Sequence, residues 1–433
     1  MYIYSKEVSE RLSYITHHIF ERILGIPFEI CTDISEFENY HGYKINYSDL
    51  EFENVIRIVP HRLLFEKNIV PQPIDISIYK DMPFFFTTKP LTESFLFDVF
   101  AACFYFLSRY EEYLPYSPDE HQRFTAGESL AYKHNFLHLA VVDRWIEFLK
   151  NAIKERYPDI VFAQKKFSFI PTYDVDIAYA YRCRGFFIQV ALYIRSFFRF
   201  DFKDIIKRTK ILSGRLNDPY NTFHYWSYSH WYYKLEACYF LLAGEKRTKF
   251  DRNTSCRSKT FKDLIRYLDY KAQIGLHASY YSKDNPKKID FEKGFLEQIL
   301  GKKVVKNRNH YLRFSLPETY QMLASKGIEQ EYSMGYVKEV GFRAGTCNPF
   351  LFFDLQNNKT SQMEIYPFLF MENALSEMKT SEEILQYLAP YIDEVKRYNG
   401  VLVSIFHNQT FDNEMWKEAY KELLKYINSQ FDE

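Results

Sequence analysis

The chain has 433 residues, of which 47% are apolar and 26% are charged, and this composition is typical of a folded globular protein. Basic and acidic residues both number 56, so no net charge exists to attract nucleic acid, and we expect no nucleic-acid partner. The six cysteines have no metal-finger spacing, and neither a signal peptide nor an apolar run long enough to cross a membrane is visible. We therefore expect a cytoplasmic protein without a transmembrane segment.

Residues 1–160 are predicted to form a smaller N-terminal α/β domain. Three short strands are expected at 28–31, 43–47 and 55–59, followed by helices over about 92–114 and 141–157. Between these helices, a turn-rich stretch at 115–131 contains Asp119, His121 and Arg123, which we expect to be solvated loop residues and not a site. A proline and a charge cluster at 156–166 mark the linker to the next domain.

Residues 161–433 are predicted to form a (β/α) barrel of about seven strands. Strands are expected at 167–173, 237–242, 272–277, 309–314, 331–336, 341–343, 365–371 and 401–407, and helices at about 223–235, 260–270, 289–300, 317–326 and 381–398. Strands that alternate with helices in this way indicate a mostly parallel sheet. The aromatic stretch 186–200 is too short to span a bilayer and carries two arginines. Of a membrane-surface helix and an amphipathic core helix, we expect the core helix.

Two acids, Asp174 and Asp176, directly follow the apolar run 167–173. On a strand, positions i and i+2 point to the same face, and two adjacent carboxylates that are buried need a metal, a cation or a proton to compensate them. Aspartate is also common at strand ends because it favours turns, so the pair alone does not decide between a site and a turn. Further polar residues at or near the predicted strand ends are His277, His310, Glu331, Arg343, Glu372 and His407. Because strand ends converge on one mouth of a β/α barrel, the pattern favours a functional site.

The order of these motifs resembles the polysaccharide deacetylase (NodB-like) family of metal-dependent hydrolases. The resemblance covers about residues 165–433 and rests on four segments: Thr172-Tyr173-Asp174-Val175-Asp176, Gly275-Leu276-His277-Ala278-Ser279-Tyr280-Tyr281, Gly341-Phe342-Arg343-Ala344-Gly345 and Val403-Ser404-Ile405-Phe406-His407-Asn408. It implies a hydrolase that removes acetyl or similar acyl groups from a carbohydrate substrate. The N-terminal region looks like the domain of unknown function that precedes this module in a bacterial subgroup associated with cell-surface polysaccharide.

The sequence departs from the family pattern at two of the positions expected to bind metal. The second histidine of the family's His-Ser/Thr-x-x-His motif falls at Tyr281, and the usual metal-binding acid falls at Val175. We expect Asp176, His277 and His310 to replace the family's ligand set, with zinc as the ion or else cobalt or nickel. His310 is equally well explained as a lone imidazole that is hydrogen-bonded in a polar strand.

The resemblance also implies roles for the remaining residues. Asp174 is expected to act as general base, Arg343 to hold Asp174 or a developing oxyanion, and His407 to act as general acid. Glu331 and Glu372 are expected to orient basic residues, although either would also be explained by an ion pair with Arg343. Arg308 would recognise an acidic sugar or pair with a surface carboxylate, and Tyr281, Asp251 and Asn253 are candidates for substrate contact.

Two other classes of function stay open at this point. A glycan-binding pseudoenzyme would keep the barrel but lose the metal, as the tyrosine at position 281 suggests. A scaffold in a polysaccharide assembly complex would use the aromatic-rich N-terminal region as its interface. No phosphate-binding loop and no G-x-S-x-G nucleophile elbow is present, so the sequence does not favour nucleotide chemistry or a serine hydrolase. The identity of the sugar and the oligomeric state are not specified by any pattern.

Overall fold

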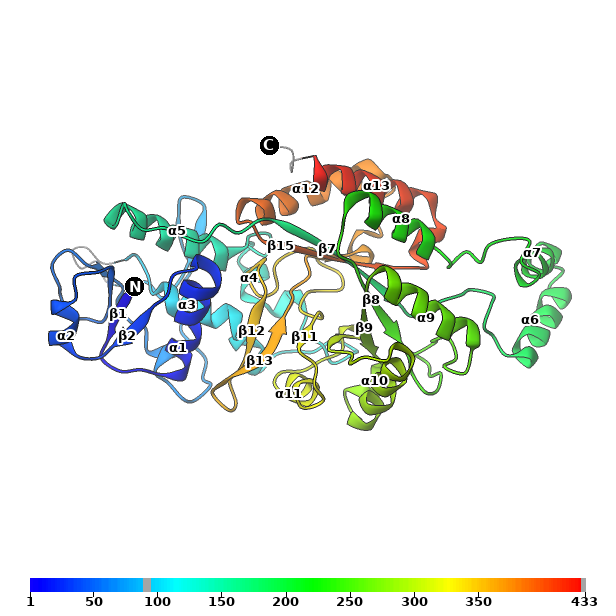
Figure 1. The fold of residues 1–433 in the computed structure, drawn as a ribbon, viewed down its shortest axis with the longest axis horizontal. Coiled ribbons are helices and arrows are strands. Elements are labelled where there is room, and N and C mark those ends of the chain that lie inside the picture. The colour runs from blue at the N-terminus through cyan, green and yellow to red at the C-terminus, as the bar shows by residue number, and fades with distance from the viewer. Residues whose placement is uncertain (89–94, 430–433) are drawn as a thin grey trace.

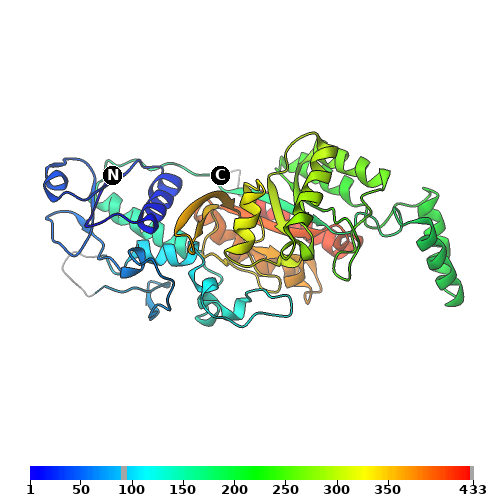
Figure 2. The same ribbon diagram turned by 90° about the horizontal axis from the view of Figure 1, so that it is seen from below.

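The computed structural model of the protein describes residues 1–88 and 95–429. The N-terminal elements lie at one end of the molecule, and a large sheet with its covering helices forms the middle (Figure 1). A hairpin of two helices, α6 and α7, projects from the far end, and the view from below shows the same elongated arrangement (Figure 2). The fold is therefore mixed α/β.

The N-terminal part is organised around a four-stranded sheet in the order β2-β1-β3-β4, in which each of the strand pairings is parallel. Its elements are β1 (Tyr2–Ser5), α1 (Glu10–Thr16), the π-helical turn η1 (His17–Leu24), β2 (Glu29–Cys31), α2 (Ile34–Asn39), β3 (Lys44–Tyr47), β4 (Ile56–Arg57), β5 (Ser77–Tyr79), β6 (Met82–Phe84), α3 (Val99–Leu107), α4 (Leu130–Lys133) and α5 (Val141–Arg156). The strands predicted at 28–31, 43–47 and 55–59 are confirmed as β2, β3 and β4. The central strand β1 was not predicted.

Helix α3 is shorter than the predicted helix over 92–114, of which residues 92–94 lie outside the described residues. The helix begins after Asp98, whose carboxylate accepts a hydrogen bond from the Ala101 N–H at 3.0 Å and caps the helix N-terminus. It ends before Arg109, which has a left-handed backbone conformation with φ of 53°. The chain then continues as a 3₁₀ turn, Tyr110–Tyr113. The predicted helix over 141–157 is confirmed as α5.

The rest of the chain forms a nine-stranded sheet and its helices. The elements are β7 (Ser168–Val175), α6 (Phe186–Phe198), α7 (Phe202–Leu212), α8 (Phe223–Tyr233), β8 (Cys238–Leu242), α9 (Lys259–Lys271), β9 (Gln273–Ala278), α10 (Pro286–Leu300), β10 (Lys306–Asn309), α11 (Glu318–Ser325), β11 (Gln330–Glu331), β12 (Phe350–Asp354), β13 (Lys359–Ile365), β14 (Phe370–Met371), α12 (Ser381–Arg397), β15 (Val401–His407) and α13 (Glu414–Asn428). The strand order is β12-β13-β11-β10-β9-β8-β7-β15-β14, and only the β12–β13 pairing is antiparallel.

The strand pairings of the described residues do not close this sheet into a barrel. The sheet is nevertheless strongly curled. The short segment 366–369 connects β13, which pairs with β11 on one side of the sheet, to β14, which pairs with β15 on the other side. Within it, the Phe368 N–H donates to the Met334 carbonyl at 3.0 Å and the Leu369 N–H donates to the Val403 carbonyl at 2.9 Å. This segment therefore links the two sides of an incomplete ring.

Several predicted strands in the second half are displaced or absent. The strand expected at 309–314 lies earlier, as β10, and the one expected at 331–336 is reduced to the two residues of β11. Residues 341–343 are not a strand, because the Phe342 N–H donates to the Leu137 carbonyl of the N-terminal part at 2.9 Å instead of to a neighbouring strand. The β12–β13 hairpin was not predicted. The expectation of a core helix at 186–200 is also wrong, since the apolar side chains of α6 are exposed.

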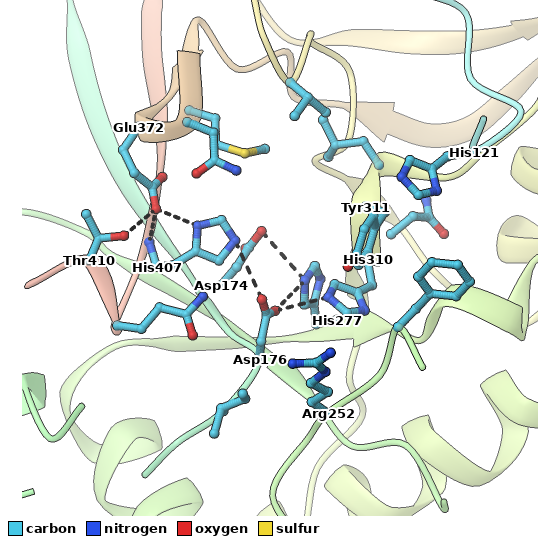
Figure 3. A pocket seen from close by; sticks show the side chains of 18 of the residues that line it. His121, Asp174, Asp176, Arg252, His277, His310, Tyr311, Glu372, His407 and Thr410 are labelled. Carbon is cyan, nitrogen blue, oxygen red and sulfur yellow. Dashed lines mark hydrogen bonds and ion pairs between the residues drawn. The ribbon is translucent and has the colours of Figure 1, made fainter. Parts of the chain in front are cut away.

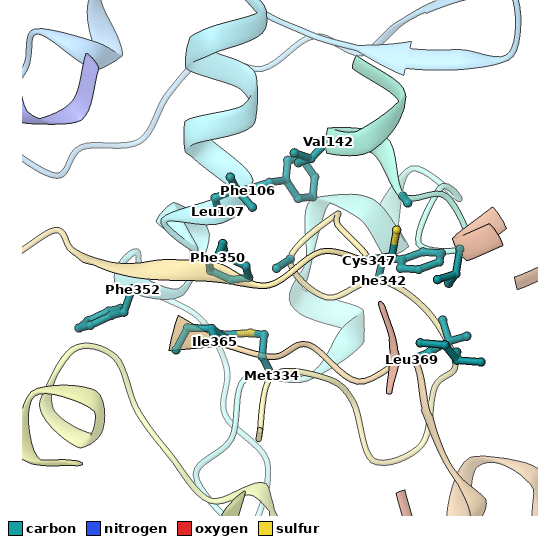
Figure 4. Close-up of a cluster of buried hydrophobic side chains, with 14 of the residues drawn as sticks. Phe106, Leu107, Val142, Met334, Phe342, Cys347, Phe350, Phe352, Ile365 and Leu369 are labelled. Atoms are coloured by element: carbon teal, nitrogen blue, oxygen red, sulfur yellow. The ribbon is translucent and has the colours of Figure 1, made fainter. Parts of the chain in front are cut away.

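One cluster of buried apolar side chains joins the N-terminal part to the large sheet. Phe106, Leu107 and Val142 face Phe342, Phe350 and neighbouring residues of the sheet (Figure 4). The ring of Phe104 packs edge-on against that of Phe353, with centroids 5.1 Å apart. Burial of this kind contributes about 25 cal/mol per Å² of apolar surface, so the two parts stabilise each other. The division at residues 160 and 161 stays a prediction.

Candidate metal centre

The carboxyl ends of β7, β9 and β15 and the turn after β10 border a cavity with a volume of about 730 Å³ (Figure 3). These strands are parallel neighbours or near neighbours, so their carboxyl ends lie at the same edge of the sheet. In this register His407 pairs with Asp174 across β15 and β7, and His277 pairs with Arg308 across β9 and β10. The register therefore brings predicted site residues to one place.

Asp176, His277 and His310 present three ligand atoms to one another. The Nε2 atoms of His277 and His310 lie 3.2 Å and 3.6 Å from Asp176 Oδ1 (Figure 3). The set offers one ligand atom from each residue, all within 4.8 Å of one another. One carboxylate and two imidazoles form an open three-ligand site of the kind that zinc uses in hydrolases.

The backbone and a second carboxylate fix the orientation of both imidazole rings. His277 Nδ1 is 2.9 Å from the Arg308 carbonyl oxygen, which accepts only, so Nδ1 carries the proton and Nε2 is free as a ligand. His310 Nδ1 is 2.9 Å from Asp251 Oδ1, so this ring also carries its proton on Nδ1 and leaves Nε2 free as a ligand. Asp251 is itself held by the Tyr280 N–H at 2.8 Å and the Thr248 hydroxyl at 3.0 Å. Such outer contacts are typical of metal-binding histidines.

The unpaired atoms of the site fit a divalent cation. Asp176 Oδ1 and His277 Nε2 are buried and have no hydrogen-bond partner among the described residues. In the neutral imidazole both atoms carry lone pairs, and two lone pairs that face each other at 3.2 Å need a cation between them. A divalent ion would satisfy both atoms together with His310.

The charges around Asp176 favour its ionised form. Burial alone would raise the pKa of Asp176, but the positive charge that His310 can carry and the contacts with both imidazoles outweigh burial and hold this pKa well below its ordinary value. Burial would lower the pKa of His310, but Asp176 and Asp251 raise it to about 9. The same two carboxylates that attract this extra proton would attract a divalent cation in its place.

Asp174 lies beside the three candidate ligands and is held by Arg308. Arg308 Nη1 donates to Asp174 Oδ1 at 2.9 Å, while Asp174 Oδ2 faces His277 Nε2 at 3.7 Å. Arg308 is fully buried, with its guanidinium 4.4 Å from the centre of the Phe240 ring and its Nε donating to the Tyr332 carbonyl at 3.0 Å. A fixed guanidinium of this kind orients the carboxylate.

His407 lies on the other side of Asp176. Its Nε2 is 3.8 Å from Asp176 Oδ2, and its Nδ1 is 2.6 Å from Glu372 Oε1. Glu372 Oε1 also accepts from the Thr410 hydroxyl at 2.9 Å. Burial would lower the pKa of His407, but the charge and hydrogen bond of Glu372 raise it to about 10. Glu372 therefore contacts a basic residue, and its orienting role stays a prediction.

The structure corrects the expected place of Arg343. Its guanidinium does not contact Asp174 but makes two hydrogen bonds with Glu112 of the N-terminal part, at 2.9 Å and 2.7 Å, and one with the Gly335 carbonyl at 2.9 Å. It lines a smaller neighbouring cavity of about 220 Å³. Arg308, from β10, occupies the position beside Asp174 that the sequence assigned to Arg343. The reason is that residues 341–343 form no strand, because the Phe342 N–H is bound to Leu137 of the N-terminal part.

Five other expected site residues lie behind the cavity or beside it. Glu331 is buried and bonds to Tyr320, Ser333 and Asn309, so it orients neutral groups and no basic residue. Arg308 is too deeply buried to recognise an acidic sugar. Asp251 and Asn253 are buried below the cavity, because alternate residues of this segment point inwards. Tyr281 packs against Tyr280 and Phe250 and is not among the residues that line the cavity.

Other residues that line the cavity were not predicted as site residues. His121 and Arg123 reach it from the N-terminal loop expected to be merely solvated: His121 Nδ1 is 3.0 Å from the Tyr280 hydroxyl, and Arg123 Nη1 donates to the Tyr311 carbonyl at 2.8 Å. Lys249 and Arg252 flank Asp251 and line the mouth. The polar residues at 119–123 were the sequence pattern that could have indicated that this loop contributes to the site. No sequence signal indicated Tyr311, whose backbone is left-handed with φ of 61°.

Comparisons with known proteins give the following likenesses. Residues 1–158 match a family described as a family of unknown function (DUF7033). No curated protein matches the chain. Among solved structures, a candidate polysaccharide deacetylase from Mycobacterium smegmatis is 12% identical with a TM-score of 0.39, and 61% of this chain and 86% of that chain are covered.

Two further solved structures are similar at the same level. The polysaccharide deacetylase Bc1974 from Bacillus cereus is 12% identical with a TM-score of 0.29, covering 61% of this chain and 89% of that one. The peptidoglycan deacetylase PdaC from Bacillus subtilis is 13% identical with a TM-score of 0.25, covering 62% and 94%. At these TM-scores the argument for function rests on the site itself and on the sequence motifs.

Proposed function

We propose that this protein is a divalent-metal-dependent hydrolase that removes acetyl or similar acyl groups from a carbohydrate. The observation that carries the proposal is the convergence of Asp176 Oδ1 with the Nε2 atoms of His277 and His310, with both rings fixed through Nδ1. The incomplete ring of strands supports a NodB-like barrel. A bacterial cell-surface setting and a preference for zinc are part of the same proposal.

A divalent ion supplies Lewis acidity towards an acyl carbonyl and towards water. The chain's own residues would carry the protons. Asp174 Oδ2 points towards the candidate ligands and would accept a proton from the attacking water, while Arg308 holds the other oxygen of this carboxylate. His407, held by Glu372 on the opposite side of Asp176, would donate a proton to the departing amine or hydroxyl.

The experiment that tests the proposal measures metal and activity together. We expect about one equivalent of zinc or a similar ion by elemental mass spectrometry in protein purified without chelator, and its loss in His277→Ala and His310→Ala. His121→Ala is the matched control, because His121 lines the same cavity without belonging to the three ligands. Acetate release from acetylated oligosaccharides should fall by about 10²–10⁴-fold in His407→Ala and Asp174→Asn, with the metal retained.

The outcomes separate the proposed function from its alternative. Protein that stays metal-free after addition of zinc, cobalt or nickel, but binds oligosaccharide, would indicate a glycan-binding pseudoenzyme. Metal lost only in His277→Ala would keep the hydrolase and remove His310 from the ligand set.

A further inference from the structure

The hairpin of α6 and α7 exposes its apolar side chains on the outside. Phe186, Val190, Ile194 and Phe197 recur at helical spacing, so they share one face of α6, and all four are exposed. Phe187 and Phe198 border this face and are 85% and 75% exposed. The face continues into the turn and α7 through Phe200, Phe202 and Ile206, of which Phe200 is 79% exposed. An apolar surface of this extent marks an interaction site.

The two helices contact each other largely through polar groups. The Ser196 hydroxyl donates to Asp204 Oδ2 at 2.7 Å, and the hydroxyls of Tyr193 and Thr209 are 3.0 Å apart. Arg208 is buried in the hairpin and pairs with Asp204 at 3.0 Å. Ile211 of α7 is buried, but the large apolar side chains named above face outwards, whereas in an ordinary amphipathic hairpin the apolar faces pack together and the polar faces meet water. The outer face is therefore suited to an apolar environment.

A row of cations runs beside the apolar face. Lys203, Lys207 and Lys210 are spaced by four and three residues on α7, so they share a face, and all three are exposed. Residues 182–216 contain nine arginines and lysines but only two aspartates. Among the described residues, no acidic side chain forms an ion pair with Lys203, Lys207 or Lys210, or with the exposed Arg195 and Arg199. The hairpin therefore combines bulky apolar groups with an excess of unpaired positive charge.

The neck of the hairpin is fixed next to the cavity. The carboxylate of Asp218 accepts hydrogen bonds from the backbone N–H groups of Ala180, Tyr181 and Arg182 at 2.7–3.0 Å and so joins the outgoing and returning chains. Ile177 and Tyr220, on either side of this neck, both line the cavity. The hairpin thus lies between β7 and α8 in the chain and projects from one end of the molecule (Figures 1 and 2).

We propose that the α6–α7 hairpin binds the surface of an anionic lipid membrane. The exposed phenylalanines and isoleucines would enter the boundary between headgroups and acyl chains, and the lysine row would contact the lipid phosphates. The hairpin lies in the interface and does not cross the bilayer: α6 has 13 residues, which span about 20 Å. None of the described helices combines the length and apolar character that a crossing requires. The proposal does not depend on the hydrolase chemistry.

The test is co-sedimentation of the full chain with lipid vesicles. We expect binding to phosphatidylcholine vesicles that contain about 30% phosphatidylglycerol, weaker binding to pure phosphatidylcholine, and release by salt. Phe187→Ser/Phe198→Ser should weaken binding to the anionic vesicles by about tenfold or more. Lys203→Glu/Lys207→Glu/Lys210→Glu should weaken it by about a hundredfold or more. Tyr270→Ser is the control, because Tyr270 is an equally exposed aromatic residue on α9.

Circular dichroism shows whether each variant is folded, because it is independent of lipid. Failure of the folded wild-type protein to bind anionic vesicles above the phosphatidylcholine background at low salt overturns the proposal. Binding that survives in both hairpin variants also overturns it. If sedimentation velocity without lipid shows a dimer that the Phe187→Ser/Phe198→Ser variant dissociates, and vesicles do not compete with it, the face is an interface with a second copy instead.

Discussion

At the scale of single residues, Asp251 connects the loop after β8 to the candidate metal centre. It is buried, it accepts the Nδ1 proton of His310, and its own oxygens are fixed by the Tyr280 N–H and the Thr248 hydroxyl. The sequence indicated Asp251 as a substrate contact, but the structure gives it the position of a residue that orients a ligand. This difference can be measured, because orienting residues affect metal affinity and substrate contacts affect KM.

Asp251→Ala should weaken zinc binding by about 10–100-fold, because the His310 ring loses the acceptor that fixes its orientation. The measurement is a competition titration against a chelator of known affinity. Asp284→Ala provides the control, since Asp284 is a half-exposed carboxylate that pairs with Arg313 away from the ligands. An Asp251→Ala variant with unchanged affinity and a raised KM would restore the original interpretation.

At the scale of elements, helix α10 carries a buried carboxylate that makes stability depend on pH. Glu292 accepts the Ser279 N–H at 3.0 Å, and burial raises its pKa to about 7 against the opposing hydrogen bonds of Ser279. A raised pKa means that the folded state holds the proton more tightly than the unfolded state. The stabilisation is thus complete below the ordinary pKa near 4.5 and is lost as the pH rises through about 7.

Glu292→Gln removes this titration while it keeps an acceptor for Ser279. Between pH 5 and pH 8 the free energy of unfolding of the wild-type protein should fall relative to the variant by about 2–3 kcal/mol. Urea denaturation at both pH values measures the difference. Glu297→Gln on the same helix should show almost no such change over this range, because Lys293 and the Val304 N–H lower the pKa of Glu297 despite the effect of burial, so Glu297 is ionised in both states above pH 5. A constant difference for Glu292→Gln across the range would contradict the prediction.

The sequence predicted elements well where the local pattern and the tertiary contacts agree. The strands β7, β9 and β15 are apolar runs with polar residues at or near their ends, and this placed Asp174, Asp176, His277 and His407 at one edge of the sheet. The sequence could not predict which residue would pair with Asp174, because the position of Arg308 depends on the register of β10 against β9. It also could not show that the apolar residues of α6 face outwards, since helical periodicity defines a face but not its surroundings.

At the scale of the whole molecule, a buried ion pair joins the two parts of the chain. Arg343 pairs with Glu112, which also accepts from Arg109 Nε at 2.8 Å. All three side chains are almost inaccessible to water. Burial would raise the pKa of Glu112, but the two guanidinium groups outweigh it and lower this pKa. Removal of Arg343 leaves Glu112 with Arg109 as its remaining charged partner, so the buried charges are less well compensated.

Arg343→Met should lower the free energy of unfolding by about 3–5 kcal/mol, because Glu112 loses its bidentate partner. The double variant Glu112→Gln/Arg343→Met should recover part of this loss, since the uncompensated carboxylate is then absent. Denaturant unfolding of the single and double variants measures both effects. An Arg343→Met protein of full stability that had lost only hydrolysis would return Arg343 to a catalytic role.

The apolar cluster between the two parts also limits how this gene can evolve. A recombination event that transferred residues 161–433 alone would expose Phe342, Phe350 and Phe353 to solvent. Arg343 would lose Glu112, its ion-pair partner. The cavity would also lose the loop that contains His121. The protein that received this segment would contain the three candidate ligands, but one side of its cavity would be open. Selection should therefore act on residues 1–158 and the sheet as one unit, and a substitution on one side of the cluster should be matched by a compensating substitution on the other.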